Sequence, residues 1–305
     1  MTEDQTEFHA GYVTIVGRPN VGKSTLLNTF LGMKLAIISP KPQTTRHRLL
    51  GVLTGDNYQI VFLDTPGLLR PRYELQQAML QAAEAAIADA DILLFMIEAT
   101  ETPNPHDLEA LEKLIATNKP IVLVINKIDL IAKSKLLPLI DTYRNQHEFA
   151  DIVPISALLA DGISILLETL VKLLPVSPPF YPPDFLTEHT ERFLVAEIVR
   201  EKVFQLYGEE IPYSTSVQID EYQEHPEGKD FIRATIYVEK ESQRRILIGK
   251  KGAALKRVGE LARADIENLV NHPVYLELWV KVREKWRKKA RDVREFGYGP
   301  TIRKL

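Results

Sequence analysis

The 305-residue sequence contains no cysteine and no long hydrophobic run. The absence of cysteine excludes disulfides, thiol catalysis and cysteine-bound zinc. No apolar run approaches the roughly 18 residues that a membrane-spanning helix needs. Residues 1–7 are acidic and lack an apolar segment, so a secretory signal is not expected. With 45% hydrophobic and 26% charged residues, the chain has the composition of a globular protein, and we expect it to act in the cytoplasm.

Charge is distributed unevenly along the chain. The whole sequence carries a net charge of −3, but residues 240–305 hold 18 Lys and Arg against 8 Asp and Glu, a local charge of +10. A basic segment on an otherwise acidic protein predicts a polyanionic partner. The alternative is a solvated basic face without a partner. A binding motif within the segment would favour the first interpretation.

A phosphate-binding motif lies near the N-terminus, in residues 17–24, Gly-Arg-Pro-Asn-Val-Gly-Lys-Ser. An apolar strand precedes it and a helical pattern follows, so loop amides and a helix N-terminus can form an anion site together. Gly17 and Gly22 let the backbone close around phosphate oxygens. Lys23 would reach the β- and γ-phosphates, and Ser24 would bind Mg²⁺. The chain is therefore expected to bind a nucleoside triphosphate.

Apolar strands alternate with helical segments from residue 12 to residue 174. This alternation predicts an α/β domain with a mostly parallel sheet and helices on both faces, whose ligands lie at the carboxyl ends of the strands. A turn at Gly55-Asp56-Asn57 predicts one hairpin within it. The strands are expected at residues 12–16, 48–54, 58–63, 91–97, 121–125 and 152–154.

Five prolines within residues 175–183 indicate a semi-rigid spacer. We therefore expect a nucleotide-binding domain over residues 1–174, a proline-rich linker over 175–184 and a smaller α+β domain over 185–305. An amphipathic helix at 191–205 is expected to open the last domain. Its elements read α-β-β-α-α-β, with strands at 213–222, 231–239 and 274–282, followed by a basic terminal helix.

Two more motifs follow predicted strands. In Asp64-Thr65-Pro66-Gly67, the carboxylate can hold Mg²⁺ through water, and the Gly67 amide can sense a γ-phosphate. In Asn126-Lys127-Ile128-Asp129, the Asp129 carboxylate can accept from the ring N–H and the amino group of guanine, a pair that adenine does not offer. Asn126 and Lys127 would brace the phosphate loop and cover the base. Backbone N–H groups of Ser156-Ala157, after the last predicted strand, would face the guanine oxygen. The predicted nucleotide-binding residues are Gly17, Asn20, Gly22, Lys23, Ser24, Thr25, Asp64, Gly67, Asn126, Lys127, Asp129, Ser156 and Ala157.

A Gly-x-x-Gly loop, residues 249–252, lies between two helices within the basic segment. KH domains use such a loop to clamp about four nucleotides of single-stranded nucleic acid. Glycines let the phosphate backbone approach, lysines supply charge, and apolar neighbours form a groove for the bases. The basic run 283–294 is either a second RNA contact or a solvated helix. The predicted RNA-binding residues are Ile248, Gly249, Lys250, Lys251, Gly252, Lys256 and Arg257, with Arg263 extending the phosphate contacts.

From about residue 11 to residue 298, the chain resembles the Era family of Ras-like GTPases, bacterial enzymes with a C-terminal KH domain. The resemblance rests on the three nucleotide motifs together with Ser156-Ala157 as a fourth, on the loop Pro42-Gln43-Thr44-Thr45-Arg46, on Asn20 and on the Gly-x-x-Gly loop. It implies a monomeric GTP hydrolase that uses GTP, GDP and Mg²⁺ and binds no DNA. It also implies that the KH domain binds single-stranded small-subunit rRNA, at the 3′ end of 16S rRNA, during small ribosomal subunit assembly. Peripheral contact with the inner face of the cell membrane is reported for the family, but nothing in this sequence requires it.

The Gln that positions water in Ras-like enzymes is missing, and Leu68, which cannot orient water, stands in its place. In relatives that share Asn20, a potassium ion held by the matching Asn supplies charge between the phosphates; alternatively, Asn20 only tolerates a tight turn. Arg18, another cation of the loop, is expected to point to solvent. Thr45 is our choice for the Mg²⁺ ligand from the switch loop, defined here as residues 37–46, and Thr44 is the competitor. The predicted catalytic residues are Lys23, Asn20, Thr45 and Gly67, and the predicted metal ligands are Ser24, Thr45 and Asp64.

A non-catalytic RNA-binding protein with guanine nucleotide as a structural ligand is the alternative function. The missing Gln favours this alternative. The presence of Ser24, Asp64 and a switch-loop Thr favours the enzyme.

Overall fold

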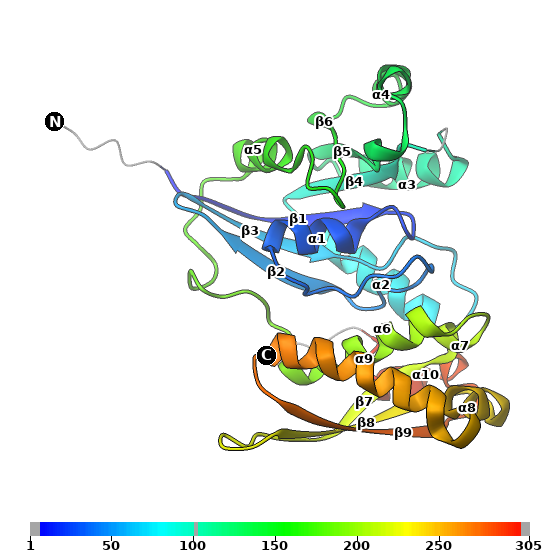
Figure 1. The fold of residues 1–305 in the computed structure, drawn as a ribbon. Coiled ribbons are helices and arrows are strands. Elements are labelled where there is room, and N and C mark those ends of the chain that lie inside the picture. The colour runs from blue at the N-terminus through cyan, green and yellow to red at the C-terminus, as the bar shows by residue number, and fades with distance from the viewer. Residues whose placement is uncertain (1–6, 101–102, 300–305) are drawn as a thin grey trace. The chain divides into compact units, whose positions relative to one another are not determined.

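The computed structural model describes residues 7–100 and 103–299 (Figure 1). Most of the acidic N-terminal stretch and residues 300–305 lie outside this described part. Contacts divide the chain into two compact units. The first consists of Met1–Ala36, Thr45–Arg70 and Met79–Glu188, and the second consists of Ile37–Thr44, Pro71–Ala78 and His189–Leu305. Two short segments of the N-terminal half therefore belong to the second unit.

A mostly parallel sheet forms the centre of the first unit, as predicted. The strand order is β2-β3-β1-β4-β5-β6, and only the β2–β3 hairpin is antiparallel. The carboxyl ends of β1, β3, β4 and β5 therefore meet at one edge, where parallel sheets bind ligands. The strands are β1 (His9–Gly17), β2 (Leu49–Thr54), β3 (Tyr58–Asp64), β4 (Ile92–Glu98), β5 (Ile121–Asn126) and β6 (Asp151–Pro154).

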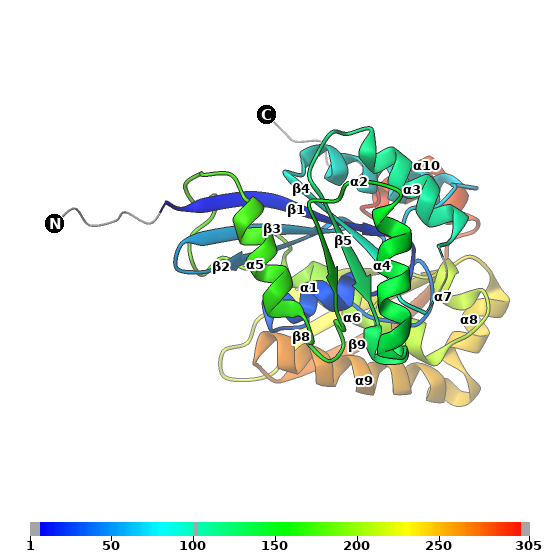
Figure 2. The same cartoon turned by 90° about the horizontal axis from the view of Figure 1, so that it is seen from above.

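Helices cover both faces of this sheet (Figures 1 and 2). Strand β3 has apolar side chains on both of its faces, because successive side chains of a strand point to opposite faces. Each face therefore needs a helix to cover it. Phe62 stacks on Phe30 of α1 with ring centroids 4.6 Å apart, whereas Val61 and Leu63 pack with Ala86 of α2 on the other face. The helices are α1 (Lys23–Leu31), α2 (Glu74–Asp89), α3 (Pro105–Ile115), α4 (Leu136–Arg144) and α5 (Ile163–Leu173), with short 3₁₀ turns η1 (Ile128–Leu130) and η2 (Lys133–Lys135).

The proline-rich segment is bound along the hairpin of the first unit. Oε1 of the buried Gln59 accepts the backbone N–H of Tyr181 at 2.9 Å. Further along, the hydroxyl of Thr187 donates to the carbonyl of Leu50 at 2.6 Å. These contacts hold residues 181–187 on β2 and β3 rather than leaving them as a free spacer.

The second unit has the predicted α-β-β-α-α-β order around a three-stranded sheet, β7-β8-β9. Strands β7 and β8 are antiparallel, and β8 and β9 are parallel. One face is covered by α6, α8 and α9, whose apolar side chains share a core with β8 and β9. The elements are α6 (Glu191–Leu206), α7 (Ile211–Ser214), β7 (Ser216–Gln223), β8 (Asp230–Val238), α8 (Glu241–Ile248), η3 (Lys250–Gly252), α9 (Ala253–Val270), β9 (Val274–Val282), η4 (Trp286–Lys288) and α10 (Ala290–Glu295).

Two predictions for this unit were wrong in detail. The strand expected from Tyr213 begins only at Ser216, because Pro212 stands in the first turn of the one-turn helix α7, a position that suits proline. The basic terminal helix is only the short α10, after the separate turn η4. Within the described residues, no helix is both long and apolar enough to cross a membrane.

Candidate functional site

The phosphate loop connects the end of β1 to the start of α1. A Cβ atom at Gly17 would lie 2.3 Å from the carbonyl oxygen of Met96. A Cβ at Gly22 would lie 2.2 Å from Nδ2 of Asn126, and the φ of Gly22 is +105°, which L side chains rarely adopt. Both glycines are therefore required by the packing of the loop against the neighbouring strands.

We expect Gly22→Ala to weaken GTP binding about tenfold or more, because strain of this kind costs about 1–3 kcal/mol and the new methyl group would displace Asn126. Calorimetric titration with GTP measures the effect. Gly32→Ala is the matched control, since Gly32 ends the same helix at φ +62° and no atom lies within 4 Å of the position that its added methyl group would take. Equal losses in the two variants would contradict this account of the loop.

Asn126 ties the phosphate loop to the loop after β6. Its Nδ2 donates to the carbonyl of Val21 at 2.7 Å, and its Oδ1 accepts the backbone N–H of Ala157 at 2.9 Å. The hydroxyl of Thr29, on α1, donates to the carbonyl of Ala157 at 2.9 Å. The loop that contains Ser156 and Ala157 is thereby fixed against the start of α1, at the predicted position for the guanine oxygen.

Lys127 and Asp129 follow β5 directly. Nζ of Lys127 forms an ion pair of 2.6 Å with Glu98, a residue that the sequence interpretation missed. The register of the sheet explains the pair, because Glu98 stands opposite Asn126 at the ends of neighbouring parallel strands. The Asp129 side chain lies exposed in η1, where a base could reach it.

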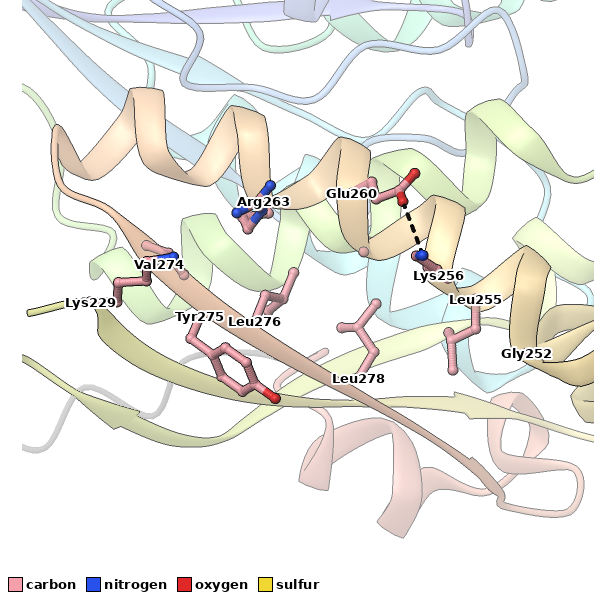
Figure 3. A pocket seen from close by; sticks show the side chains of 11 residues that line it. Lys229, Gly252, Leu255, Lys256, Glu260, Arg263, Val274, Tyr275, Leu276 and Leu278 are labelled. Atoms are coloured by element: carbon pink, nitrogen blue, oxygen red, sulfur yellow. Dashed lines mark ion pairs between the residues drawn. The ribbon is translucent and has the colours of Figure 1, made fainter.

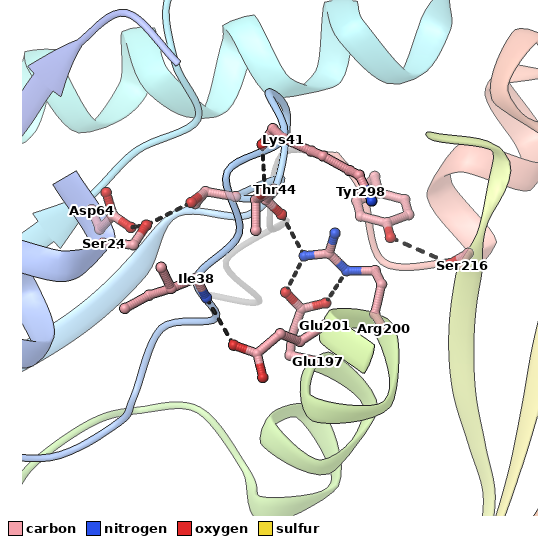
Figure 4. Close-up of polar contacts among 11 residues, drawn as sticks. Ser24, Ile38, Lys41, Thr44, Asp64, Glu197, Arg200, Glu201, Ser216 and Tyr298 are labelled. Atoms are coloured by element: carbon pink, nitrogen blue, oxygen red, sulfur yellow. Dashed lines mark hydrogen bonds and ion pairs between the residues drawn. The ribbon is translucent and has the colours of Figure 1, made fainter. Parts of the chain in front are cut away.

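Three oxygen-bearing side chains converge beside the phosphate loop (Figure 4). The hydroxyl of Ser24 donates to Oδ2 of Asp64 at 2.6 Å and lies 2.8 Å from the hydroxyl of Thr45. Oδ1 of Asp64 is buried and has no hydrogen-bond partner in the described part of the chain. The hydroxyl of Thr44 donates instead to the carbonyl of Lys41 at 2.7 Å. This geometry favours Thr45 over Thr44 as a metal ligand, and the oxygen donors suit Mg²⁺.

Burial makes this site electrostatically unusual. Burial raises the pKa of Asp64 to about 6, against the opposing effects of Lys23 and of hydrogen bonds. Burial also lowers the pKa of Lys23 to about 8, against the effect of Asp64. Nζ of Lys23 donates to the carbonyls of Gly17 at 3.1 Å and Arg18 at 2.9 Å. A bound anionic phosphate would favour the charged lysine, and a bound divalent cation would favour the charged carboxylate.

The side chain that follows Gly67 packs into the core. Leu68 lies against a cluster that includes Val16 and Phe95, and its backbone N–H donates to the carbonyl of Gly17 at 3.4 Å. A Cβ at Gly67 would lie 2.6 Å from the backbone nitrogen of Pro19, so this segment approaches the phosphate loop closely. Leu68 therefore fixes the loop after β3 and offers no polar group to water.

The prediction that Arg18 points to solvent was wrong. Its Nε lies 2.7 Å from Oδ1 of Asp107, and that carboxylate is buried in the first turn of α3. An acidic residue is favoured there by the helix dipole and can hold the arginine in addition. Asn20 has a φ of +69°, in the left-handed region that asparagine tolerates better than most residues. The left-handed turn is therefore one reason for asparagine at this position, and it leaves the predicted potassium role open.

A groove of about 480 Å³ runs along α9 and β9 in the second unit (Figure 3). Leucine side chains form much of its wall, and charged side chains stand around it, as a nucleic-acid groove requires. Lys256 lies 4.0 Å from Glu260. The lining residues are Lys229, Gly252, Leu255, Lys256, Gly259, Glu260, Arg263, Val274, Tyr275, Leu276 and Leu278.

The Gly-x-x-Gly loop lies at the start of α9, next to this groove. A Cβ at Gly249 would come 2.6 Å from Cβ of Ala254, and Gly252 has a φ of +79°. Lys250 and Lys251 are exposed. The ammonium groups of Lys250 and Lys251 can thus contact phosphates from a loop whose glycines allow close backbone packing.

The other predicted RNA-binding residues take different places. Gly252 and Lys256 line the groove, Ile248 packs partly into the core, and Arg257 is exposed 3.7 Å from Glu260. Sequence reasoning missed Tyr275, which is 59% exposed in β9 and lines the groove; an aromatic residue within the predicted strand 274–282 was the available signal.

The basic run 283–294 is not a single solvated helix. Arg283 forms ion pairs with Asp292 at 2.7 Å and Glu295 at 2.6 Å. Arg287 pairs with Glu239 at 2.6 Å. At least these two arginines therefore hold the C-terminal elements of the second unit together.

Family models match both parts of the chain. Residues 12–127 match the family described as "50S ribosome-binding GTPase", and residues 210–287 match the KH domain. The GTPase match includes the phosphate loop, Asp64 and Asn126. The KH match includes the groove.

Curated relatives match nearly the whole chain. GTPase Era of Syntrophus aciditrophicus is 50% identical over 293 residues, which is 95% of each chain. GTPase Era of Geobacter metallireducens is 47% identical over 292 residues, which is 95% of this chain and 98% of the relative.

Solved structures agree with these relatives. A variant of Aquifex aeolicus Era bound to GDP.AlF4− is 46% identical with a TM-score of 0.93, covering 96% of this chain and 100% of the other. Era in complex with MgGDPNP and nucleotides 1506–1542 of 16S ribosomal RNA is 47% identical, also with a TM-score of 0.93, covering 96% and 99%. The chain therefore belongs to the Era family of GTPases.

Proposed function

We propose that this GTPase binds the 3′ end of 16S rRNA through its KH groove and uses GTP hydrolysis to act in small ribosomal subunit assembly. The observation that carries the proposal is the convergence of Ser24, Thr45 and Asp64 beside the phosphate loop, in a chain that also contains a KH groove. The proposal keeps the predicted division into a nucleotide domain at 1–174, a linker at 175–184 and an RNA-binding domain at 185–305.

The nucleotide would be held by the residues that the motifs predict. Lys23 would contact the β- and γ-phosphates, the Gly67 amide would meet the γ-phosphate, and Asp129 would recognise guanine. Asn126 supports this role indirectly, because it already braces the phosphate loop against Ala157. GTP and GDP are thus the proposed ligands of the first unit.

Ser24, Thr45 and Asp64 would hold Mg²⁺. The buried Oδ1 of Asp64, which lacks a hydrogen-bond partner among the described residues, supports this assignment. When bound, Mg²⁺ neutralises charge on the β- and γ-phosphates. The residues of this chain orient the phosphates and exclude water from the buried side of the site.

The proposed RNA partner is supported by the relative whose crystal contains nucleotides 1506–1542 of 16S rRNA. In this chain the leucines of the groove would lie against bases, and Lys250, Lys251 and Lys256 would contact phosphates. Because rRNA lies in the cytoplasm, we infer that the protein acts there. That it acts as a monomer stays an implication of the family resemblance. A peripheral contact with the membrane stays a prediction of the family resemblance.

Potassium is the proposed catalytic cation. We expect hydrolysis to be several-fold faster in potassium than in sodium at equal ionic strength, because electrostatic stabilisation between the phosphates is worth powers of ten in rate. Asn20→Gly should remove this difference while keeping GDP affinity, since glycine adopts the φ of +69° without providing an amide oxygen. Leu68→Ala should change the rate much less than it would if residue 68 positioned the attacking water. Equal rates in the two salts would overturn the potassium assignment.

A multiple-turnover phosphate-release assay on the full chain tests the enzyme against the structural-ligand alternative. The proposal expects steady release of many phosphates per protein with GTP and none above background with ATP. Retention of GTP without turnover, in either salt and with the RNA added, would favour the alternative.

A further inference from the structure

Helix α6 is buried on two sides. Val195, Val199 and Val203 face the core of the second unit. An amphipathic helix was expected here, but its charged residues Glu197, Arg200 and Glu201 are only 8%, 0% and 1% exposed. Residues spaced by three and four positions share one face of a helix. Buried charges on such a face require polar partners.

The partner of Arg200 is the switch loop (Figure 4). Glu197 holds the guanidinium at two points, through Nε at 2.7 Å and Nη2 at 2.5 Å. Nη2 of Arg200 also donates to the backbone carbonyl of Thr44 at 2.6 Å. This contact lies within the second unit, because residues 37–44 belong to it.

Two more contacts attach the same segment to α6. The backbone N–H of Ile38 donates to Oε1 of Glu201 at 3.0 Å. Nζ of Lys41 donates to the carbonyls of Phe204 and Tyr207, at the C-terminal end of the helix. Carbonyls there lack partners within the helix, and the helix dipole favours a cation beside them. Residues 38–44 are therefore fixed to α6 at both ends and in the middle.

Thr44 and Thr45 are consecutive, but their contacts differ. The carbonyl of Thr44 is held by Arg200, whereas the hydroxyl of Thr45 reaches Ser24 at 2.8 Å. Since that carbonyl belongs to the peptide that joins the two residues, holding it restricts where the hydroxyl of Thr45 can lie. Arg200 thus acts on a proposed Mg²⁺ ligand without touching nucleotide or metal itself.

We propose that Arg200 is a positioning residue for GTP hydrolysis, which places Thr45 through the Thr44–Thr45 peptide. This inference rests on the proposed role of Thr45 at the metal. It gives Arg200 of α6 an indirect part in arranging the hydrolytic site, through the Thr44–Thr45 peptide. Removal of a group that orients a metal ligand typically costs about 10–100-fold in metal affinity or activity.

Two variants test the inference on the full chain. Arg200→Lys keeps a positive charge beside Glu197. It loses the planar guanidinium, which donates to Glu197 and to the carbonyl of Thr44 at the same time. Glu197→Met with Arg200→Met removes the whole pair, so that no buried carboxylate is left unpaired. Arg192→Met is the control, since Arg192 lies exposed on the same helix and donates to backbone carbonyls of β7. Thermal unfolding and GDP titration check that each variant is folded.

The readout is single-turnover GTP hydrolysis as a function of Mg²⁺ concentration. We expect both Arg200 variants to need about tenfold more Mg²⁺ for half-maximal rate, with GDP affinity close to that of the parent and with Arg192→Met unchanged. In a Thr45→Ala background, the Arg200 variants should have almost no further effect, because residues that act through one another are not additive.

The outcomes separate the two proposals. If Thr45→Ala raises the Mg²⁺ requirement and folded Arg200 variants do not, the role of Arg200 is wrong and the metal site stands. If Thr45→Ala has no effect, the proposed role of Thr45 at the metal is wrong, and the inference about Arg200 fails with it. Full additivity of the two changes would show that Arg200 does not act through Thr45, and this would also overturn the inference.

Discussion

Replacing Lys250 and Lys251 with Asp is expected to abolish binding of single-stranded RNA while GTP hydrolysis continues. Both lysines are exposed on the Gly-x-x-Gly loop beside the groove of α9 and β9. Each charge reversal removes a phosphate contact and adds repulsion from the RNA backbone. For single strands, log affinity falls with log salt by about 0.7 per neutralised phosphate, so residual binding should also depend less steeply on salt.

Fluorescence anisotropy with a labelled pyrimidine-containing single strand measures this effect. Lys133→Asp with Lys135→Asp is the matched control, because it reverses two exposed lysines of η2 in the first unit. The control should bind RNA nearly as the parent does. RNA binding by the Lys250 and Lys251 variant at the parental level would show that the loop does not contact RNA.

Asp129→Asn should change which base the first unit selects. The carboxylate of Asp129 can accept two hydrogen bonds from one edge of guanine, whereas an asparagine would place a donor against a donor. A mismatch that leaves buried polar groups unpaired costs orders of magnitude in discrimination. We expect GTP affinity to fall by more than about tenfold and XTP affinity to rise.

Competitive titration with GTP and XTP measures both affinities. Asp141→Asn is the control, since it makes the same chemical change at an exposed position of α4. Unchanged GTP binding in Asp129→Asn would remove this residue from the site.

The nucleotide motifs were predictable because each is local. Gly22, Lys23 and Ser24 stand in one short loop, and Asp64 follows directly from a strand whose apolar run is visible in the sequence. Thr45 could not be separated from Thr44 by pattern, since both are polar residues of an irregular loop. Their contacts distinguish them, because the hydroxyl of Thr45 reaches Ser24 whereas that of Thr44 donates to the carbonyl of Lys41.

The rest depends on contacts between distant residues, for which the sequence holds no local signal. Arg18 was expected in solvent because it stands at the start of the phosphate loop, but Asp107 reaches it from α3. The amphipathic helix expected at 191–205 is also wrong, because charged residues of α6 such as Arg200 and Glu201 are buried together with its apolar residues. The partner of Arg200 is a backbone carbonyl, that of Thr44, which no residue pattern can reveal.

Ultraviolet crosslinking of the full, GTP-bound chain to an RNA with the sequence of nucleotides 1506–1542 of 16S rRNA tests the central claim most directly. Peptide mapping should place the crosslinks in residues 249–263 and 274–278, which form the loop and the walls of the groove. The Lys250 and Lys251 variant should lose these crosslinks. Crosslinks confined to the first unit, or crosslinks in the groove that an unrelated RNA reproduces with equal yield, would contradict the proposed recognition of the rRNA 3′ end.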